Sequence, residues 1–504
     1  MKLEPRPYQR AIYNSIVQQG NMLVVLPTGL GKTLIAFMLI ETKIKEGKCL
    51  FLAPTRPLVK QHYNSFLEIS GIDPSLVTIV TGEIPKKKRE ALYDKQVIFS
   101  TPQTIKNDLL SNTLKTPETF SLVIFDEAHR AIGNYAYTLV GEKMNGRSLI
   151  VGLTASPGGD RARINKILAN LFIKNVQIRT KHDADVREHV MDIEVKWIET
   201  QLTPDLKLVK GELDRMIAEY AQKLAHMGFP PQTKSKRLFI ALRQKILDMN
   251  SPAKYAILVT YSMLLNLLHM QELIETQGAS ALRKYLEKMA TKDTKSAAAL
   301  LRKPEIMKIK SILSSTSEEH PKLPLLIGLA KEQLAGKKII VFAQYRDQVA
   351  LIENALQGAG ITARMFLGKK DTYTKAQQEE TIAQFREDKF RVLVASSIGE
   401  EGLDIPAVDA VIFYEPTPSE IRSIQRRGRA GRFKEGQVYI LITKGTRDEY
   451  FHWASVNREK RMKSIMGGMQ KSSEESVGAP EKKEPPRKKI ETDEGGQSKL
   501  RSFF

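Results

Sequence analysis

Two series of short, almost continuously apolar segments constrain the fold more than any other feature of this sequence. The first series comprises residues 21–27, 48–54, 96–101, 121–127 and 148–154. The second comprises residues 337–344, 390–397, 409–416 and 436–443. Strands that are apolar on both faces and are separated by helices form parallel sheets with helices on each side. The sequence therefore predicts two α/β domains.

Residues 203–316, between the two series, have a different pattern. Their apolar residues recur at helical spacing, with breaks at 230–231, 251–252 and Gly278. This pattern predicts an all-helical module of about four or five helices. The stretch 255–270 is apolar, but polar residues interrupt it and it is too short to cross a bilayer, so we expect a buried helix.

The last part of the chain, from about residue 466 onward, is rich in Gly, Ser, Glu, Lys and Pro. It offers too little apolar surface to offset the entropy lost on ordering, so we expect disorder. The predicted organisation is an α/β domain over 1–202, a helical insertion over 203–316, a second α/β domain over 317–465 and a tail over 466–504.

The charge balance indicates a polyanionic partner. Lys and Arg total 78 against 57 acidic residues, which gives a formal net charge of +21 and a pI near 9.6. Nucleic acid is the simplest such partner. An acidic membrane surface is the competing interpretation, but no lipidation motif or basic amphipathic terminal helix supports it. The single cysteine, Cys49, excludes an intrachain disulfide, and the start carries no apolar signal region, so we expect an intracellular protein.

The first predicted strand runs into the sequence LPTGLGKT, residues 26–33, and a helical pattern follows. A glycine-rich turn between a strand and a helix presents backbone N–H groups to a phosphate. Lys32 would reach the β- and γ-phosphates of ATP, and the Thr33 hydroxyl would coordinate Mg²⁺. The usual first glycine of this pattern is Leu26 here, so an incidental turn stays open. The predicted cradle comprises Pro27, Thr28, Gly29, Gly31, Lys32 and Thr33.

The sequence DEAH, residues 126–129, ends another predicted strand. In α/β sheets, ligands bind at the carboxyl ends of the strands. Asp126 is suited to hold Mg²⁺ through water, and Glu127 to orient and deprotonate an attacking water. The alternative is an exposed acidic turn, which fits poorly after an apolar strand in a domain with a phosphate cradle.

The second α/β domain carries QRRGRAGR, residues 425–432. Guanidinium groups stabilise the charge that develops in phosphoryl transfer. We assign Arg429 and Arg432 as fingers that reach the γ-phosphate from the second domain. Taken alone, the stretch also fits a solvated basic surface.

These motifs stand in a longer ordered series that resembles superfamily 2 helicases. The series adds RPYQ (6–9), APTRPL (53–58), STPQ (100–103), LTASP (153–157), VFAQYRD (341–347) and ASSIGEEGLDIP (395–406). The segment GLTASPGGD and the helical insertion are similar to the Hef/FANCM branch. The resemblance implies two RecA-like motor domains.

The resemblance also implies roles for further residues. It places nucleotide contacts at Arg6, Gln9, Gly402, Asp404 and Gln425. It places coupling between the ATP and nucleic-acid sites at His129, Thr154 and Ser156. It places contacts to the phosphates of the tracked strand at Thr55, Arg56, Thr101, Gln344, Arg346 and Ser396.

The leading interpretation is an ATP-dependent DNA helicase that acts on branched DNA, such as stalled forks and Holliday junctions, in replication-fork repair and recombination. For an archaeal Hef-like protein, this implies a cytoplasmic, nucleoid-associated location. A double-stranded RNA translocase of the Dicer-like branch stays open, because motor motifs of both kinds track phosphates. A non-catalytic scaffold is the third reading, which the intact ATP-site residues disfavour. About seventy residues follow the arginine motif, without the signature of an XPF-like nuclease, so nuclease activity is not expected here.

The sequence QSKLRSFF, residues 497–504, resembles the PCNA-interacting peptide of replication and repair proteins. One helical turn would place three apolar side chains on one side, as a plug for a pocket on the sliding clamp. A chance match is the alternative for so short a motif. A separate structure-specific nuclease on the same clamp could then act beside the helicase. The residues assigned to the clamp are Gln497, Leu500, Phe503 and Phe504.

Overall fold

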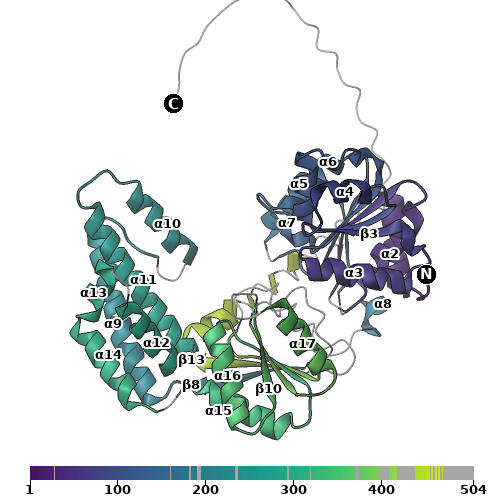
Figure 1. Ribbon diagram of the computed structural model, residues 1–504. Coiled ribbons are helices and arrows are strands. Elements are labelled where there is room, and N and C mark those ends of the chain that lie inside the picture. Colours follow the sequence, from purple (N-terminus) through teal and green to yellow (C-terminus); the bar gives the residue numbers. More distant parts are fainter. Residues whose placement is uncertain are drawn as a thin grey trace, which may run out of the picture.

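The computed structural model contains two α/β domains and a helical bundle (Figure 1). It describes residues 1–27, 29–158, 160–180, 183–189, 194–232, 236–291, 294–317, 319–368, 374–396, 408–416 and 437–454, with 456–457, 460–461, 464–465 and 468. The fold class expected from the sequence is confirmed. Among the predicted site residues, Thr28, Gly402, Asp404, Gln425, Arg429, Arg432 and the four clamp residues 497, 500, 503 and 504 lie outside the described residues.

The first sheet is entirely parallel, in the order β3-β4-β2-β5-β6-β1-β7. Its strands are β1 (Met22–Val25), β2 (Lys48–Leu52), β3 (Val77–Val80), β4 (Val97–Ser100), β5 (Phe120–Asp126), β6 (Leu149–Thr154) and β7 (Asn175–Ile178). Its helices are α1 (Pro7–Gln19), α2 (Lys32–Lys43), α3 (Arg56–Ile69), α4 (Lys86–Leu92), α5 (Pro102–Leu110), α6 (Ala136–Met144), α7 (Arg161–Asn170) and α8 (Ala184–Arg187).

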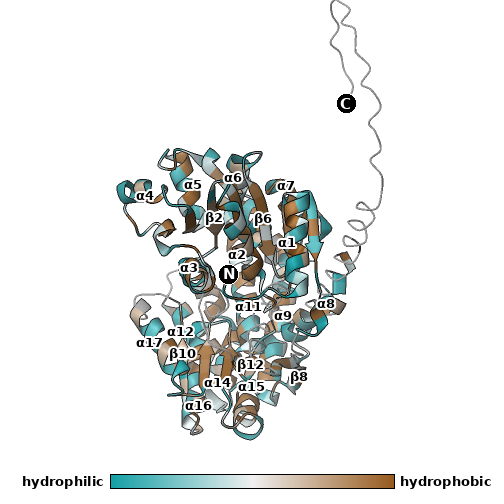
Figure 2. Ribbon diagram, turned by 90° about the vertical axis from the view of Figure 1, so that its right-hand side faces the viewer, coloured by the Kyte–Doolittle hydropathy of each residue, from teal (hydrophilic) through white to brown (hydrophobic). Residues whose placement is uncertain are grey.

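Both faces of this sheet are buried, which explains its unbroken apolar strands. Successive residues of β1 enter different cores: Met22 and Val24 pack with α1, α2 and α3, whereas Leu23 and Val25 pack with α5, α6 and α7. In Figure 2 the strands β2 and β6 are accordingly brown. Because all strands are parallel, their carboxyl ends meet at one edge, where the motif residues gather.

The second sheet has the order β10-β11-β9-β12-β13-β8 and is also parallel. Its strands are β8 (Glu194–Gln201), β9 (Ile339–Phe342), β10 (Ala363–Phe366), β11 (Val392–Ala395), β12 (Ala410–Phe413) and β13 (Gln437–Lys444). The helices of this domain include α15 (Lys322–Gly328), α16 (Arg346–Gly358) and α17 (Lys375–Arg386).

The placement of β8 corrects the predicted domain boundary at residue 202. The predicted boundary assigns residues 194–201 to the first domain, without a strand there, but as β8 they pair with β13 along their whole length and form an edge of the second sheet. The sequence did not indicate this because β8 is not continuously apolar: Lys196, Trp197 and Glu199 are exposed, as suits an edge strand. The helical bundle is therefore inserted after the first strand of the second domain.

The bundle comprises α9 (Pro204–His226), α10 (Lys236–Leu247), α11 (Lys254–Thr276), α12 (Ala279–Ala290), α13 (Lys295–Leu301) and α14 (Pro304–Ser315). α11 is the one described helix that is long and apolar enough to cross a membrane by length and composition. Its apolar residues, among them Leu264 and Leu267, form the core of the bundle with α9, α10, α12 and α13. Burial in the core of the bundle therefore explains why α11 is so apolar, as predicted for a buried helix.

Candidate ATP and nucleic-acid site

The turn between β1 and α2 has the geometry of a phosphate cradle. Gly29 and Gly31 have φ angles of 87° and 71°, a region that favours glycine, and Gly31 is the N-cap of α2. The Lys32 ammonium group lies in the turn, where it donates to the carbonyl oxygens of Leu26 at 2.8 Å and Pro27 at 3.4 Å. The turn thus directs a helix N-terminus and one cation toward the same space, which is what a phosphate requires.

The start of α1 holds this turn from one side. The Gln9 side chain donates to the carbonyl oxygen of Leu30 at 3.1 Å and accepts from the backbone N–H of Arg6 at 2.8 Å. The Tyr8 hydroxyl donates to the same Leu30 oxygen at 2.8 Å. A Cβ on Gly31 would lie 2.4 Å from Gln9 Nε2, so only glycine permits this contact. Gln9 and Arg6 therefore lie beside the cradle, and their contact with the nucleotide stays a prediction.

Asp126 ends β5, two strands away from the cradle, and Glu127 follows it. Asp126 is buried, and its Oδ2 lies 3.0 Å from Nε2 of His62 on α3, a residue that the sequence analysis missed. The Tyr137 hydroxyl donates to the Asp126 carbonyl oxygen at 2.5 Å. The other carboxylate oxygen of Asp126, Oδ1, and the Thr33 hydroxyl are the type of oxygen ligand that Mg²⁺ takes. This ion binds few protein ligands beside phosphate oxygens.

Glu127 stands in a left-handed conformation, with φ of 51°. Burial acts to raise its pKa, but the hydrogen bond from His129 and the charges of His129, Lys32 and Arg130 outweigh burial and lower the pKa to about 2. The carboxylate is therefore ionised at neutral pH, the state in which it can accept a hydrogen bond from an attacking water.

A chain of contacts leads from Glu127 to the end of β6. Nδ1 of His129 lies 3.2 Å from Oε2 of Glu127 and 3.2 Å from Oγ1 of Thr154. The Thr154 hydroxyl donates to the carbonyl oxygen of Ser156 at 3.0 Å and accepts from its N–H at 3.1 Å. The structure thus brings together the three residues predicted to couple the two sites.

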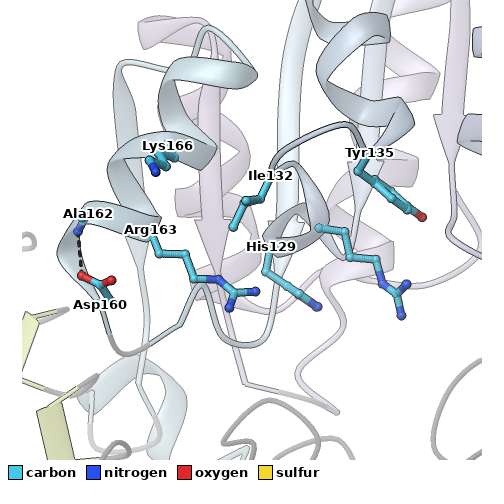
Figure 3. Close-up of a pocket in the computed structure, with 8 residues that line it drawn as sticks. His129, Ile132, Tyr135, Asp160, Ala162, Arg163 and Lys166 are labelled. Carbon is cyan, nitrogen blue, oxygen red and sulfur yellow. Dashed lines mark hydrogen bonds between the residues drawn. The ribbon is translucent and has the colours of Figure 1, made fainter. Parts of the chain in front are cut away.

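A pocket of about 400 Å³ opens beside His129. Figure 3 shows Arg163 extending from α7 along this pocket, and Lys166 belongs to the same helix. Gly158 has φ of 112°, and a Cβ there would lie 3.1 Å from the Arg163 side chain. The Asp160 carboxylate caps α7 by accepting from Ala162 N at 3.0 Å. These contacts give the GLTASPGGD segment a structural role.

A second pocket of about 400 Å³ brings together the predicted phosphate contacts of the first domain. The Thr55 hydroxyl is buried there without a hydrogen-bond partner among the described residues. Arg56 pairs with the exposed Glu83 at 2.6 Å, and the hydroxyls of Thr101 and Thr104 lie 2.8 Å apart. The lining also includes residues that sequence reasoning missed: Gly82, Arg89, Gln103, Thr104 and Asn107.

The predicted contacts of the second domain also share one edge of their sheet. Gln344 and Arg346 follow β9, and Ser396 follows the neighbouring strand β11. The Gln344 N–H donates to Glu415 Oε2 at 3.0 Å, and the Arg346 guanidinium donates to the carbonyl oxygen of Gly368. Each sheet therefore presents polar groups at the carboxyl ends of its strands.

Comparison with a solved structure decides the family. The crystal structure of the Pyrococcus furiosus Hef helicase domain is 40% identical, covers 90% of this chain and 98% of that chain, and superposes with a TM-score of 0.70. The chain belongs to the superfamily 2 helicases of the Hef/FANCM/Mph1 type. Relatives of this type are named as ATP-dependent helicases.

Three family profiles match parts of the first α/β domain, the bundle and the second α/β domain, and none of the three includes β8. They are "Type III restriction enzyme, res subunit" over 2–159, "Putative ATP-dependent RNA helicase, helical bundle" over 205–320 and "Helicase conserved C-terminal domain" over 321–434. The last of these includes the arginine motif.

Curated relatives carry both DNA and RNA names. A protein of Methanocaldococcus jannaschii named as an RNA helicase is 39% identical over 93% of this chain and 61% of its own length. A protein of Schizosaccharomyces pombe named as a DNA helicase is 30% identical over 89% of this chain and 62% of its own length. FANCM of Arabidopsis thaliana, named as an RNA helicase, is 34% identical over 88% of this chain and 35% of its own length. This helicase thus spans less than two thirds of each of these relatives.

Proposed function

We propose that this helicase uses ATP to translocate on DNA and acts on branched structures such as stalled forks and Holliday junctions. The observation that carries the proposal is the polar pocket of about 400 Å³ at Thr55, Arg56 and Thr101, on the same sheet edge as the ATP cradle. Contacts of this kind track a strand without reading its sequence. The net charge of +21 favours the same class of partner.

The ATP site supports hydrolysis through named groups. Lys32 and the cradle N–H groups would bind the phosphates, and Glu127 would orient the attacking water and accept its proton. Mg²⁺, held by Asp126 and Thr33, would supply neutralisation of the phosphate charge. Arg429 and Arg432, from the second domain, would complete the site as fingers, so that hydrolysis accompanies domain closure. Contacts of the second domain with the nucleotide would come from Gly402, Asp404 and Gln425.

The bundle α9–α14 would hold the branch. It is inserted into the second motor domain, it lies outside the motor motifs, and its Lys and Arg residues outnumber its Asp and Glu residues. A basic helical surface beside a strand-tracking motor suits a duplex arm, because the arm presents phosphates at a fixed offset from the tracked strand.

A comparison of ATPase stimulation tests the substrate class. Forked DNA, linear duplex DNA and double-stranded RNA would be compared at equal nucleotide concentration and fixed salt. We expect the highest turnover and the lowest KM for the fork. Stronger stimulation by double-stranded RNA would instead support the Dicer-like reading, which the RNA names of two relatives favour. Binding of all three without ATP hydrolysis would support the scaffold reading.

We further propose that residues 497–504 bind the PCNA sliding clamp. The spacing of Gln497, Leu500, Phe503 and Phe504 supports this assignment, and a terminal segment that binds the clamp would raise the local concentration of the motor there. The double variant Phe503→Ala/Phe504→Ala should lose clamp binding in calorimetry and keep its fork-stimulated ATPase. Wild-type protein that fails to bind the clamp at tens of micromolar, roughly the weak end for a short peptide, would refute the assignment. A nucleoid-associated location in the cytoplasm and a separate clamp-bound nuclease accord with it.

A further inference from the structure

The helical bundle meets the second motor domain at a cluster of buried and half-buried charged and polar side chains, which we call the joint. It links the last turns of α11 to the segment after β13, to the start of α15 and to the ends of β9 and β12. Its members are Glu272, Glu275, His320, Lys322, Tyr345, Glu415, Arg447 and Asp448.

Arg447 is the centre of the joint on the motor side, and its hydrogen-bond partners in the described part of the chain lie on α11. Its N–H donates to Glu275 Oε2 at 3.0 Å, and its guanidinium donates to Gln271 Oε1 at 2.8 Å and to the Leu268 carbonyl oxygen at 3.3 Å. Glu275 is only 2% exposed. Burial raises the pKa of Glu275, while Arg447 acts to lower it. Removing the arginine would leave a buried carboxylate with less compensation, which is costly.

Tyr345 connects the joint to the predicted nucleic-acid contacts. Its hydroxyl donates to Glu272 Oε1 on α11 at 2.7 Å. It stands between Gln344 and Arg346 at the start of α16. A displacement of α11 relative to the second sheet would therefore move the loop that carries these two residues.

A second set of contacts joins the end of α11, the start of α15 and the segment after β13. Lys322 and Asp448 form an ion pair, and both side chains are fully buried. Nε2 of His320 lies 2.9 Å from the carbonyl oxygen of Glu275. Gly278, the residue before α12, packs so closely that a Cβ there would lie 2.7 Å from His320 N. These contacts span more than forty residues of sequence and leave little freedom for rotation between bundle and sheet.

We propose that the joint makes the bundle and the second motor domain one rigid unit, and that Arg447 is the positioning residue through which a branch held by the bundle sets the loop 344–346. The coupling step rests on the proposed function, because it needs a branch bound by α9–α14. Rigidity itself does not depend on the substrate. ATP-driven closure of the motor then carries the bundle with it.

Distances between spin labels test the rigid unit without reference to the substrate. Ala225→Cys on α9 and Asn354→Cys on α16 are exposed positions on the two parts, and the buried Cys49 would be changed to Ser. We expect one narrow distance distribution that a non-hydrolysable ATP analogue leaves unchanged, and a clearly broader one in Arg447→Met. A broad distribution in the parent protein, or one that shifts with the analogue, would overturn the proposal.

ATPase assays test the coupling. Arg447→Met and the milder Glu272→Ala should bind forks within about twofold of wild type. Glu272→Ala removes the acceptor of Tyr345 and the longer ion pairs with Arg447 and His269. Both variants should keep stimulation by linear duplex and lose the additional stimulation by forks. Lys444→Met is the matched control, because Lys444 pairs with Glu199 at the exposed edge of the same sheet. A fork preference that survives in both joint variants would refute the coupling. A wild type without fork preference would refute the proposed function instead, and the distance measurement would still decide rigidity.

Discussion

The imidazole of His62 contacts the carboxylate of Asp126 at 3.0 Å, and this contact ties α3 to the predicted magnesium ligand. α3 begins at the phosphate pocket, with Thr55 and Arg56 at its start. The His62 ring also packs against Phe51, with ring centroids 4.8 Å apart. One helix therefore touches both the groove that would hold a strand and the carboxylate that would hold Mg²⁺.

We predict that His62→Ala weakens the use of Mg²⁺. Groups that orient a metal ligand typically contribute about 10- to 100-fold in metal affinity or activity. The Mg²⁺ concentration for half-maximal ATPase should rise by about that factor, while duplex binding stays intact. His62→Gln, which keeps a side-chain N–H, should recover part of the loss. An unchanged Mg²⁺ titration for His62→Ala would show that the contact serves packing alone.

Lys32→Ala should abolish ATP hydrolysis and leave DNA binding largely intact. The lysine lies in the cradle turn, and the phosphate pocket at Thr55 is formed by other loops. Turnover with forked DNA and the Kd for the same fork measure the two effects separately. Hydrolysis near the wild-type rate would show that the cradle assignment is wrong.

Arg429→Ala and Arg432→Ala should reduce turnover far more than ATP affinity. An arginine finger contributes roughly 10³- to 10⁵-fold in rate in phosphoryl-transfer enzymes. Single-turnover hydrolysis and nucleotide binding would be measured for each variant. If a variant has normal turnover, the arginine that it lacks is not a finger and belongs to a solvated basic surface.

Gly278→Ala should destabilise the protein, since Gly278 has φ of 98° and ψ of −166°, a region essentially restricted to glycine. Such a conformation costs about 1–3 kcal/mol for another residue, and the contact with His320 adds to it. Chemical unfolding gives the free energy. Gly211→Ala is the control: Gly211 lies within α9 with open space around its Cβ position, so alanine there should be neutral or stabilise by up to about 1 kcal/mol. Equal effects of the two changes would contradict the role of Gly278.

Stability should also depend on pH through Glu415. Its pKa is raised from 4.5 to about 7, mainly by burial. The charges of Asp448 and Glu272 raise this pKa further, whereas Lys322 and the Gln344 N–H lower it. Because the folded state holds this proton more tightly than the unfolded chain, the carboxyl favours folding below pH 4.5 and loses that contribution as pH rises toward 7.

Glu415→Gln removes this titration and keeps an acceptor for Gln344. The free energy of unfolding of wild type relative to the variant should therefore fall between pH 4.5 and 7 and level off above. A difference that is constant with pH would contradict the raised pKa.

Local sequence patterns were sufficient to predict the two motor sheets and the motifs at their strand ends. They were insufficient to predict contacts between residues that are far apart in the sequence. The cradle and the DEAH residues lie at strand ends, so an apolar run followed by a motif placed them correctly. Short or mixed strands such as β3, β7 and β10 gave no comparable signal. His62 could have been suspected from its position on the buried face of α3, with Val59 and Phe66. Arg447 and Glu275 could not, because their contact joins residues that are 172 apart in sequence.

The early position of β8 in the chain affects the order in which the protein can assemble during synthesis. The ribosome makes β8 before the whole bundle and β13 after it. β8 therefore stays unpaired while the intervening chain is synthesised. An unpaired strand is a site for wrong pairing with other chains. A bundle that folds quickly would bring the two ends of the insertion together and shorten the time for which β8 is unpaired. Fragments cut at residue 202 would separate β8 from its sheet permanently, and we expect them to aggregate.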